Sequence, residues 1–122
     1  VGMQLLATEG KEKGNHKGLG WIKGKVIKLK KTKKIKIPHM GWNTVKTIAK
    51  HPIIKKKNFE SYFVHSYNFI CNDKKNIIAT SDYEQKITAI VGKDNIIGTQ
   101  FHPEKSQKNG IEILKNFISW SY

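Results

Sequence analysis

Residues 96–106 read IIGTQFHPEKS, and this stretch indicates both a buried strand and a reactive site at its end. Its apolar beginning is typical of a strand in the core. Pro103 disfavours the helical conformation for the residue before it, so His102 should leave the strand in an extended conformation. Glu104 lies on the same loop, where its carboxylate can orient the imidazole. The stretch therefore offers two members of a nucleophile–base–acid triad and no nucleophile.

The composition predicts a single small domain with a modest core. The chain has 122 residues, 38% of them hydrophobic, and no apolar run approaches the length needed to cross a bilayer. Its one cysteine, Cys71, excludes an internal disulfide and a metal site built from several cysteines. No basic neighbour or helix start adjoins Cys71 to activate its thiol. We therefore expect a cytoplasmic protein with no metal, no cofactor, no membrane contact and no nucleophile at Cys71.

The chain is strongly basic. Its formal net charge is +14, from 23 basic and 9 acidic residues, which suggests a nucleic-acid-binding module. Every basic residue is lysine, whereas arginine is the usual choice for bidentate recognition of bases and phosphates. We therefore interpret the charge as a compositional bias and expect no nucleic-acid partner, with the lysine-rich module kept as an alternative of a different class.

Short strands separated by turns dominate the middle of the chain. Alternating and continuous apolar patterns predict strands over residues 24–30, 34–37, 44–48, 61–67, 76–81, 86–91 and 95–101. Residues 8–20 are rich in glycine and charge and predict a loop. The carboxylate of Glu12 lies in that loop, where composition alone indicates a solvated side chain.

The last segment, residues 109–120, predicts an amphipathic helix. Asn109 is placed to cap its first turn. Its apolar residues recur at helical spacing: Ile111, Leu114, Phe117 and Ile118.

Two further stretches carry unusual combinations of side chains. Residues 38–43 read PHMGWN and predict a turn, which is either a buried connector or a binding surface, since Trp and Met are enriched at interfaces. Residues 61–67 end in His65, Ser66 and Tyr67, three hydrogen-bonding side chains at the exit of a strand. A histidine in that position is either structural or part of a site.

Four stretches, in order along the chain, resemble one family. Residues 100–106, QFHPEKS, resemble the catalytic histidine–glutamate signature of the class I, triad-type glutamine amidotransferases. Residues 1–6, VGMQLL, resemble the segment that comes directly after that family's nucleophilic cysteine. Residues 38–43 and 62–67 resemble signatures of its branch in histidine biosynthesis. The resemblance implies an α/β fold, the C-terminal part of a flavodoxin-like three-layer domain with a mixed central sheet and helices on both faces.

The resemblance also implies how the domain is divided. Residues 1–122 would be the C-terminal part of one amidotransferase domain, beginning immediately after the nucleophilic cysteine, with the N-terminal half of the domain absent. Cys71 lies after a different strand and is not expected to replace that nucleophile.

Residue roles come from the same resemblance. It implies that His102 is the catalytic base, that Glu104 orients it, and that Val1 and Gly2 belong to the oxyanion hole. The residues expected to bind glutamine are Gln4, Glu12, His65, Ser66 and Tyr67. Those expected to face a partner subunit are Met40, Trp42, Asn43 and Lys105.

The implied function is hydrolysis of glutamine to glutamate and ammonia. The ammonia would pass to a TIM-barrel cyclase subunit, the partner in a heterodimer of histidine biosynthesis. A close alternative is the same architecture acting on a surface-sugar precursor, and a third is a catalytically dead subunit with a structural role. We expect the 122 residues alone to be inactive because they lack the nucleophile.

Overall fold

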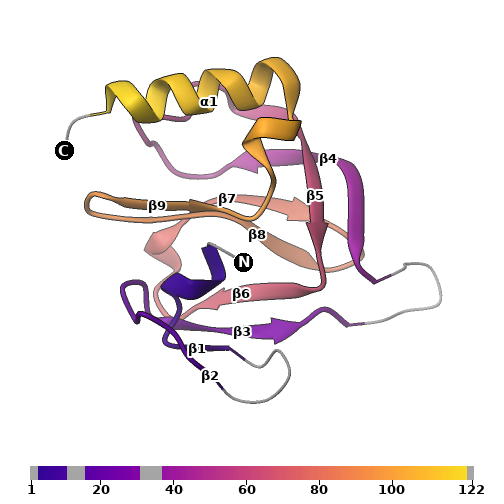
Figure 1. Cartoon of the computed structure of the whole chain (residues 1–122), viewed down its shortest axis with the longest axis vertical. Coiled ribbons are helices and arrows are strands. Elements are labelled where there is room, and N and C mark those ends of the chain that lie inside the picture. The colour runs from indigo at the N-terminus through magenta and orange to yellow at the C-terminus, as the bar shows by residue number, and fades with distance from the viewer. Residues whose placement is uncertain (1–2, 11–15, 31–36, 121–122) are drawn as a thin grey trace.

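The computed structural model describes residues 3–10, 16–30 and 37–120, and these ranges contain two β-sheets and one α-helix, with the four-stranded sheet at the end of the molecule away from the helix (Figure 1). The four-stranded sheet has the order β2-β1-β3-β6, with β1 and β3 parallel and the other pairs antiparallel. Its strands are β1 (Glu9–Gly10), β2 (His16–Lys17), β3 (Gly24–Lys28) and β6 (Tyr67–Cys71).

The five-stranded sheet is antiparallel throughout, in the order β5-β4-β7-β8-β9. Its strands are β4 (His39–Thr47), β5 (Asn58–His65), β7 (Ile77–Asp82), β8 (Lys86–Lys93) and β9 (Ile96–Thr99). Three short 3-10 turns and the helix complete the described chain: η1 (Met3–Leu6), η2 (Lys74–Asn76), η3 (Pro103–Lys105) and α1 (Gln107–Ser119).

The strands predicted over 24–30, 61–67, 76–81, 86–91 and 95–101 are confirmed, with shifts of a few residues at their ends. The strand predicted over 34–37 lies almost wholly outside the described residues. The loop predicted over 8–20 contains β1 and β2, so that prediction was wrong for those four residues. Their two-residue strands are too short to show a periodic pattern in the sequence.

The turn predicted over 38–43 was also wrong. Residues 39–43 begin β4, and the strand predicted over 44–48 is confirmed as its second half. β4 pairs with β5 from His39 opposite His65 to Lys46 opposite Asn58. Gly41 has a φ of +118°, a conformation that glycine adopts readily and other residues rarely do. The backbone can therefore bend at Gly41 while β4 stays paired with β5. Pairing with a long neighbouring strand therefore outweighs the local turn signals.

The two sheets join at a corner, residue 66, where the chain leaves β5 and enters β6. Asn68 links the sheets beyond this corner, because its amide donates to the Lys86 carbonyl at 3.1 Å and accepts from the Thr88 N–H at 3.0 Å. The apolar core is divided into two clusters. One gathers around Phe63 and Ile90 and the other around Phe69 and Val26.

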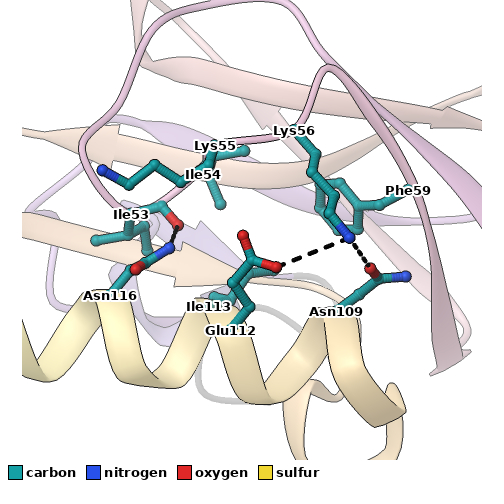
Figure 2. Close-up of a pocket in the computed structure, with 9 residues that line it drawn as sticks. All are labelled: Ile53, Ile54, Lys55, Lys56, Phe59, Asn109, Glu112, Ile113 and Asn116. Carbon is teal, nitrogen blue, oxygen red and sulfur yellow. Dashed lines mark hydrogen bonds and ion pairs between the residues drawn. The ribbon is translucent and has the colours of Figure 1, made fainter.

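Helix α1 lies along the five-stranded sheet and is fastened to the loop before β5 (Figure 2). The Lys56 ammonium lies 2.9 Å from Asn109 Oδ1 and 3.7 Å from a Glu112 carboxylate oxygen, and the Asn116 amide donates to the Ile53 carbonyl at 3.0 Å. Asn109 also donates to the Glu60 carbonyl. Its side chain thus ties the helix to its neighbours, and the prediction that it caps the helix was wrong, since the helix begins earlier, at Gln107.

The buried face of α1 is not the one that carries its regular apolar stripe. The residues that the helix buries are Gly110 and Ile113. The four apolar residues that recur at helical spacing are all exposed, Ile118 by 83%: Ile111, Leu114, Phe117 and Ile118. The helix is turned this way because Gly110 packs directly against the backbone of Pro103 in η3.

Candidate active site

His102 and Glu104 form a hydrogen-bonded pair on the loop after β9. His102 Nδ1 and Glu104 Oε1 are 2.8 Å apart, and both side chains are partly open to solvent. An ionised carboxylate can only accept, so the His102 Nδ1–H donates to it. In the neutral ring this leaves the lone pair on Nε2, which is the form of imidazole that a general base needs.

The Glu104 carboxylate is held in its ionised form. A hydrogen bond from its own backbone N–H, and then the His102 ring beside it, lower the pKa of Glu104. At neutral pH it is therefore an acceptor that fixes the orientation of the imidazole.

Ser106 anchors this loop to β5, a role that the sequence did not reveal. Its side chain is 1% exposed, and its hydroxyl donates to the His102 carbonyl at 2.7 Å and accepts from the Tyr62 N–H at 3.0 Å. The His102 N–H in turn donates to the Tyr62 carbonyl at 2.9 Å. A serine four residues after a histidine is too common a spacing to signal such an anchor.

A pocket opens beside His102 and brings together segments that are far apart in the sequence. Its lining includes Met3 and Leu6 of η1, Val64 near the end of β5, Gly98 of β9, and Gln100 and His102. Gly98 permits this approach, since a Cβ there would lie 2.9 Å from the Met3 side chain. The stretches singled out in the sequence around residues 4, 65 and 102 therefore meet at one place.

Gln4 connects the predicted glutamine-binding residues to the histidine loop. Its amide nitrogen lies 3.4 Å from the Tyr67 carbonyl and 3.3 Å from Gln100 Oε1. Tyr67 and Ser66 are half-buried at the corner between the sheets, and the Ser66 carbonyl accepts from the Leu29 N–H. The other residues predicted around the substrate, Val1, Gly2 and Glu12, lie outside the described residues.

His65 is buried below the pocket. Only 6% of its surface is exposed, and both ring nitrogens bond within the protein, one to His39 and one to the Tyr67 carbonyl. Its ring therefore supports the corner, and nothing in the local sequence indicates that His39 is its partner.

The residues predicted to face a partner divide into two groups. Met40 and Trp42 are exposed on β4, and Trp42 packs edge-on against Tyr62, whose ring centroid also lies 5.9 Å from the Lys105 ammonium. Asn43 is half-buried instead, and its amide donates to the Asp82 carbonyl at 2.8 Å. Residues 38–43 thus provide both an exposed aromatic surface, at Trp42, and a side chain, Asn43, that connects β4 to β7.

Cys71 has the properties of an inert thiol. Burial, and then the nearby Asp73 carboxylate, raise its pKa to about 11. It lies opposite Gly24 at the far end of β6 from Tyr67, about 13 Å along the strand. At neutral pH it is protonated and therefore not nucleophilic.

Metal ligands and membrane-spanning helices were sought in the same part of the chain. In residues 3–10, 16–30 and 37–120, no three His, Cys, Asp or Glu side chains gather closely enough to hold a metal ion. Among these described residues, the one α-helix is too short and too polar to cross a membrane.

Comparison with known proteins identifies relatives of this chain. Residues 1–120 match the family model described as glutamine amidotransferase class-I. The imidazole glycerol phosphate synthase subunit HisH of Rhodopseudomonas palustris is 47% identical over 98% of this chain and 58% of its own length. The corresponding protein HisH 2 of Methanococcus maripaludis is 52% identical over 97% of this chain and 59% of its own.

A solved structure shows the same fold. It is a Thermoplasma acidophilum protein assigned to GMP synthase, with a TM-score of 0.61 and 24% identity, over 79% of this chain and 47% of that one. The chain spans somewhat more than half the length of the curated relatives it matches. The α/β class expected from the sequence is thus confirmed.

Proposed function

Because the chain belongs to the class I glutamine amidotransferase family, we propose that the protein hydrolyses glutamine to glutamate and ammonia. The observation that carries the proposal is the His102–Glu104 pair, 2.8 Å apart, at the edge of a pocket that Met3 and Val64 also line. The names of relatives 47% and 52% identical support a role in imidazole glycerol phosphate synthase over an enzyme acting on a surface sugar.

The nucleophile in this proposal is a cysteine carried by the intact protein immediately before Val1. His102 Nε2 accepts the thiol proton, and the thiolate attacks the carbonyl carbon of the glutamine side-chain amide. The carbon–nitrogen bond then breaks, and His102 gives its proton to the leaving ammonia. Water, deprotonated by the same ring, hydrolyses the thioester to glutamate and restores the thiol.

The remaining groups stabilise the charges of this reaction. Glu104 holds the imidazole in the Nδ1–H tautomer and stabilises its cation. The N–H of Val1, with Gly2 leaving room for the turn, would hold the oxyanion, and one such donor lowers the barrier by roughly 3 to 4 kcal/mol. Glu12 suits the α-ammonium of glutamine, and the backbone around Ser66 and Tyr67 suits its α-carboxylate.

We further propose that the surface of Trp42, Tyr62 and Lys105 faces a TIM-barrel cyclase subunit. These side chains are in contact and lie next to the His102 loop, since the His102 and Tyr62 backbones are hydrogen-bonded. Ammonia leaving His102 would enter the partner at this surface without meeting water, which would protonate it. A biosynthetic synthase of this kind belongs in the cytoplasm.

Ammonia release from glutamine by the full-length protein with its cyclase partner tests the proposal. His102→Ala should lower turnover by about a thousandfold or more, and Glu104→Gln should also lower it strongly, because each removes one member of a unit. Cys71→Ala is the matched control and should retain full activity, since its thiol is buried and protonated. Near-wild-type turnover of His102→Ala would refute the role of His102.

A further inference from the structure

Four polar groups form a continuous hydrogen-bonded chain beneath the corner between the two sheets. Asn43 Nδ2 lies 3.2 Å from His39 Nε2, His39 Nδ1 lies 2.8 Å from His65 Nε2, and His65 Nδ1 lies 2.8 Å from the Tyr67 carbonyl oxygen. The register of β4 and β5 creates this chain by placing His39 directly opposite His65. The two histidines are 2% and 6% exposed, so their rings are shielded from water.

The positions of the protons in this chain are determined by its two ends. A carbonyl oxygen only accepts, so His65 donates from Nδ1 and, as a neutral ring, accepts at Nε2. His39 must then donate from Nδ1 and accept at Nε2. One N–H of the Asn43 amide donates to His39 Nε2, and the other donates to the Asp82 carbonyl.

The orientation of the Asn43 amide is fixed independently. Its oxygen accepts from the Thr44 N–H at 2.8 Å, which excludes the flipped amide. Every donor and acceptor of the chain is therefore satisfied in one arrangement, with all donors directed toward Tyr67. A second proton on either ring would set two N–H groups against each other.

The surroundings of the rings also favour the neutral forms. His39 stacks between Phe63, at 4.7 Å between ring centroids, and Tyr83, at 4.1 Å. Burial, and then the neighbouring His65, lower the pKa of His39 to about 4, and burial lowers the pKa of His65. Both rings are therefore neutral near pH 7.

The Tyr67 end of the hydrogen-bonded chain is linked through Gln4 to the lining of the proposed glutamine pocket. The Tyr67 carbonyl that accepts from His65 also accepts from Gln4, whose amide reaches Gln100, two residues before His102. Val64, which precedes His65, lines the pocket with His102. The ring of His65 thus fixes both the end of β5 and the carbonyl just beyond the corner.

We propose that His39 and His65 are a positioning pair, both neutral and both protonated on Nδ1, that holds the Tyr67 carbonyl and so shapes the pocket for glutamine. The measurement of KM for glutamine as a test of this inference rests on the proposed function. It assigns no proton transfer to the pair, and its structural content, the two tautomers, is independent of the reaction.

Two substitutions at His65 each keep one of the two hydrogen bonds of the ring and remove the other. In His65→Asn the amide nitrogen replaces Nδ1 and still donates to the Tyr67 carbonyl. In His65→Gln the amide oxygen replaces Nε2 and still accepts from His39, but the donor to Tyr67 is lost. In the full-length protein with its partner, we expect KM for glutamine to rise about tenfold in His65→Gln and in His65→Leu, the effect of one lost buried hydrogen bond.

The same measurement on His65→Asn should give a KM within a factor of about three of wild type, because the bond to Tyr67 remains. His51→Asn is the matched control, since His51 packs against Trp120 away from the pocket, and should not change KM. Equal KM values for His65→Asn and His65→Gln, or unchanged KM in all His65 variants, would overturn the proposal.

A spectroscopic test does not depend on activity. In the full-length protein labelled with ¹⁵N-histidine, the signals of each ring are those that disappear in His39→Asn or in His65→Asn. At pH 7 these signals in the wild type should show Nδ1–H tautomers for both rings, with a coupling across the Nδ1–H···Nε2 bond. An Nε2–H tautomer or an imidazolium at either position would overturn the pairing. If the tautomers are as stated but His102→Ala retains turnover, the proposed function fails and the pairing stands.

Discussion

His39 and His102 show how a residue's surroundings decide what a histidine does. His102 is partly open to solvent beside a carboxylate, which orients the ring for proton exchange. His39 is buried between aromatic rings and bonded at both nitrogens, which excludes proton exchange at neutral pH. The same side chain is therefore suited to act as a base in one place and as a fixed connector in the other.

The buried histidine should make stability depend on pH. The pKa of His39 is lowered from 6.5 to about 4, so between these values the unfolded chain binds more protons than the folded one. Stability is thus fully present above pH 6.5 and decreases as the pH falls toward 4, by roughly 3 kcal/mol at most from this residue. Urea unfolding of the full-length protein between pH 7 and 4.5 should show the decrease.

His39→Gln is the matched variant for this measurement. It removes the titrating group, so its stability should depend less steeply on pH over the same range, although carboxylates still titrate at the acid end. Parallel curves for the variant and the wild type would contradict the assignment of the pH dependence to His39.

The sequence predicted those site residues whose relation is local. His102 and Glu104 are two positions apart with a proline between them, so their pairing could be derived without knowing the fold. Ser106 and the His39–His65 pair could not be predicted. Their partners are set by the register of β4, β5 and the loop after β9, and pairing over such distances leaves no mark in the local sequence.

Among the elements, α1 shows why periodicity found the helix but not its orientation. Its most regular apolar stripe is exposed, whereas the buried face is built around Gly110 and Ile113. A contact made by a glycine carries no hydrophobic signal, so the pattern could not show which side meets the protein. The first half of β4 was missed for a related reason, because Gly41 and Pro38 are turn signals that long-range pairing outweighs.

The contact of Gly110 with η3 leads to a prediction about how α1 is held. A Cβ at position 110 would lie 1.7 Å from the Pro103 carbonyl oxygen, so Gly110→Ala must displace α1 from η3. The gain in helix propensity of about 1 kcal/mol is outweighed by this overlap, and overpacking costs about 1 to 3 kcal/mol. Because Pro103 lies between His102 and Glu104, ammonia release should fall together with stability.

Gly10→Ala provides the control in β1, where the new Cβ would meet Val26 at an ordinary 3.9 Å. It should leave ammonia release by the full-length protein with its partner close to wild type, while Gly110→Ala lowers both the urea midpoint and the turnover. Wild-type stability and turnover in Gly110→Ala would show that the contact with Pro103 does not hold the histidine loop.

Across the molecule as a whole, the charged side chains and the exposed apolar side chains lie on different surfaces. The net charge of +14 comes from lysines such as Lys25 and Lys28, exposed on β3, which is typical of a solvated sheet face. The apolar surface lies elsewhere, on the outer side of α1 and around Trp42. Since the chain belongs to the class I glutamine amidotransferase family, we interpret these lysines as a solvated surface.

The final prediction concerns the 122 residues as an isolated chain. They hold His102 and Glu104, but their one cysteine, Cys71, has a pKa of about 11 and lies at the other end of β6 from Tyr67. We therefore expect no release of ammonia from glutamine by this chain, in contrast to the full-length protein. The exposed apolar side of α1 should also make the isolated chain associate with itself.

Ile118→Lys tests the second part of this prediction, because Ile118 is the most exposed residue of that apolar side, at 83%. Light scattering of the isolated chain should show less association in Ile118→Lys than in the wild type, whereas Lys108→Ala, on the same helix, should change little. The first part would be contradicted if the isolated wild-type chain formed glutamate from glutamine and His102→Ala did not. That result would show that His102 acts without a cysteine other than Cys71.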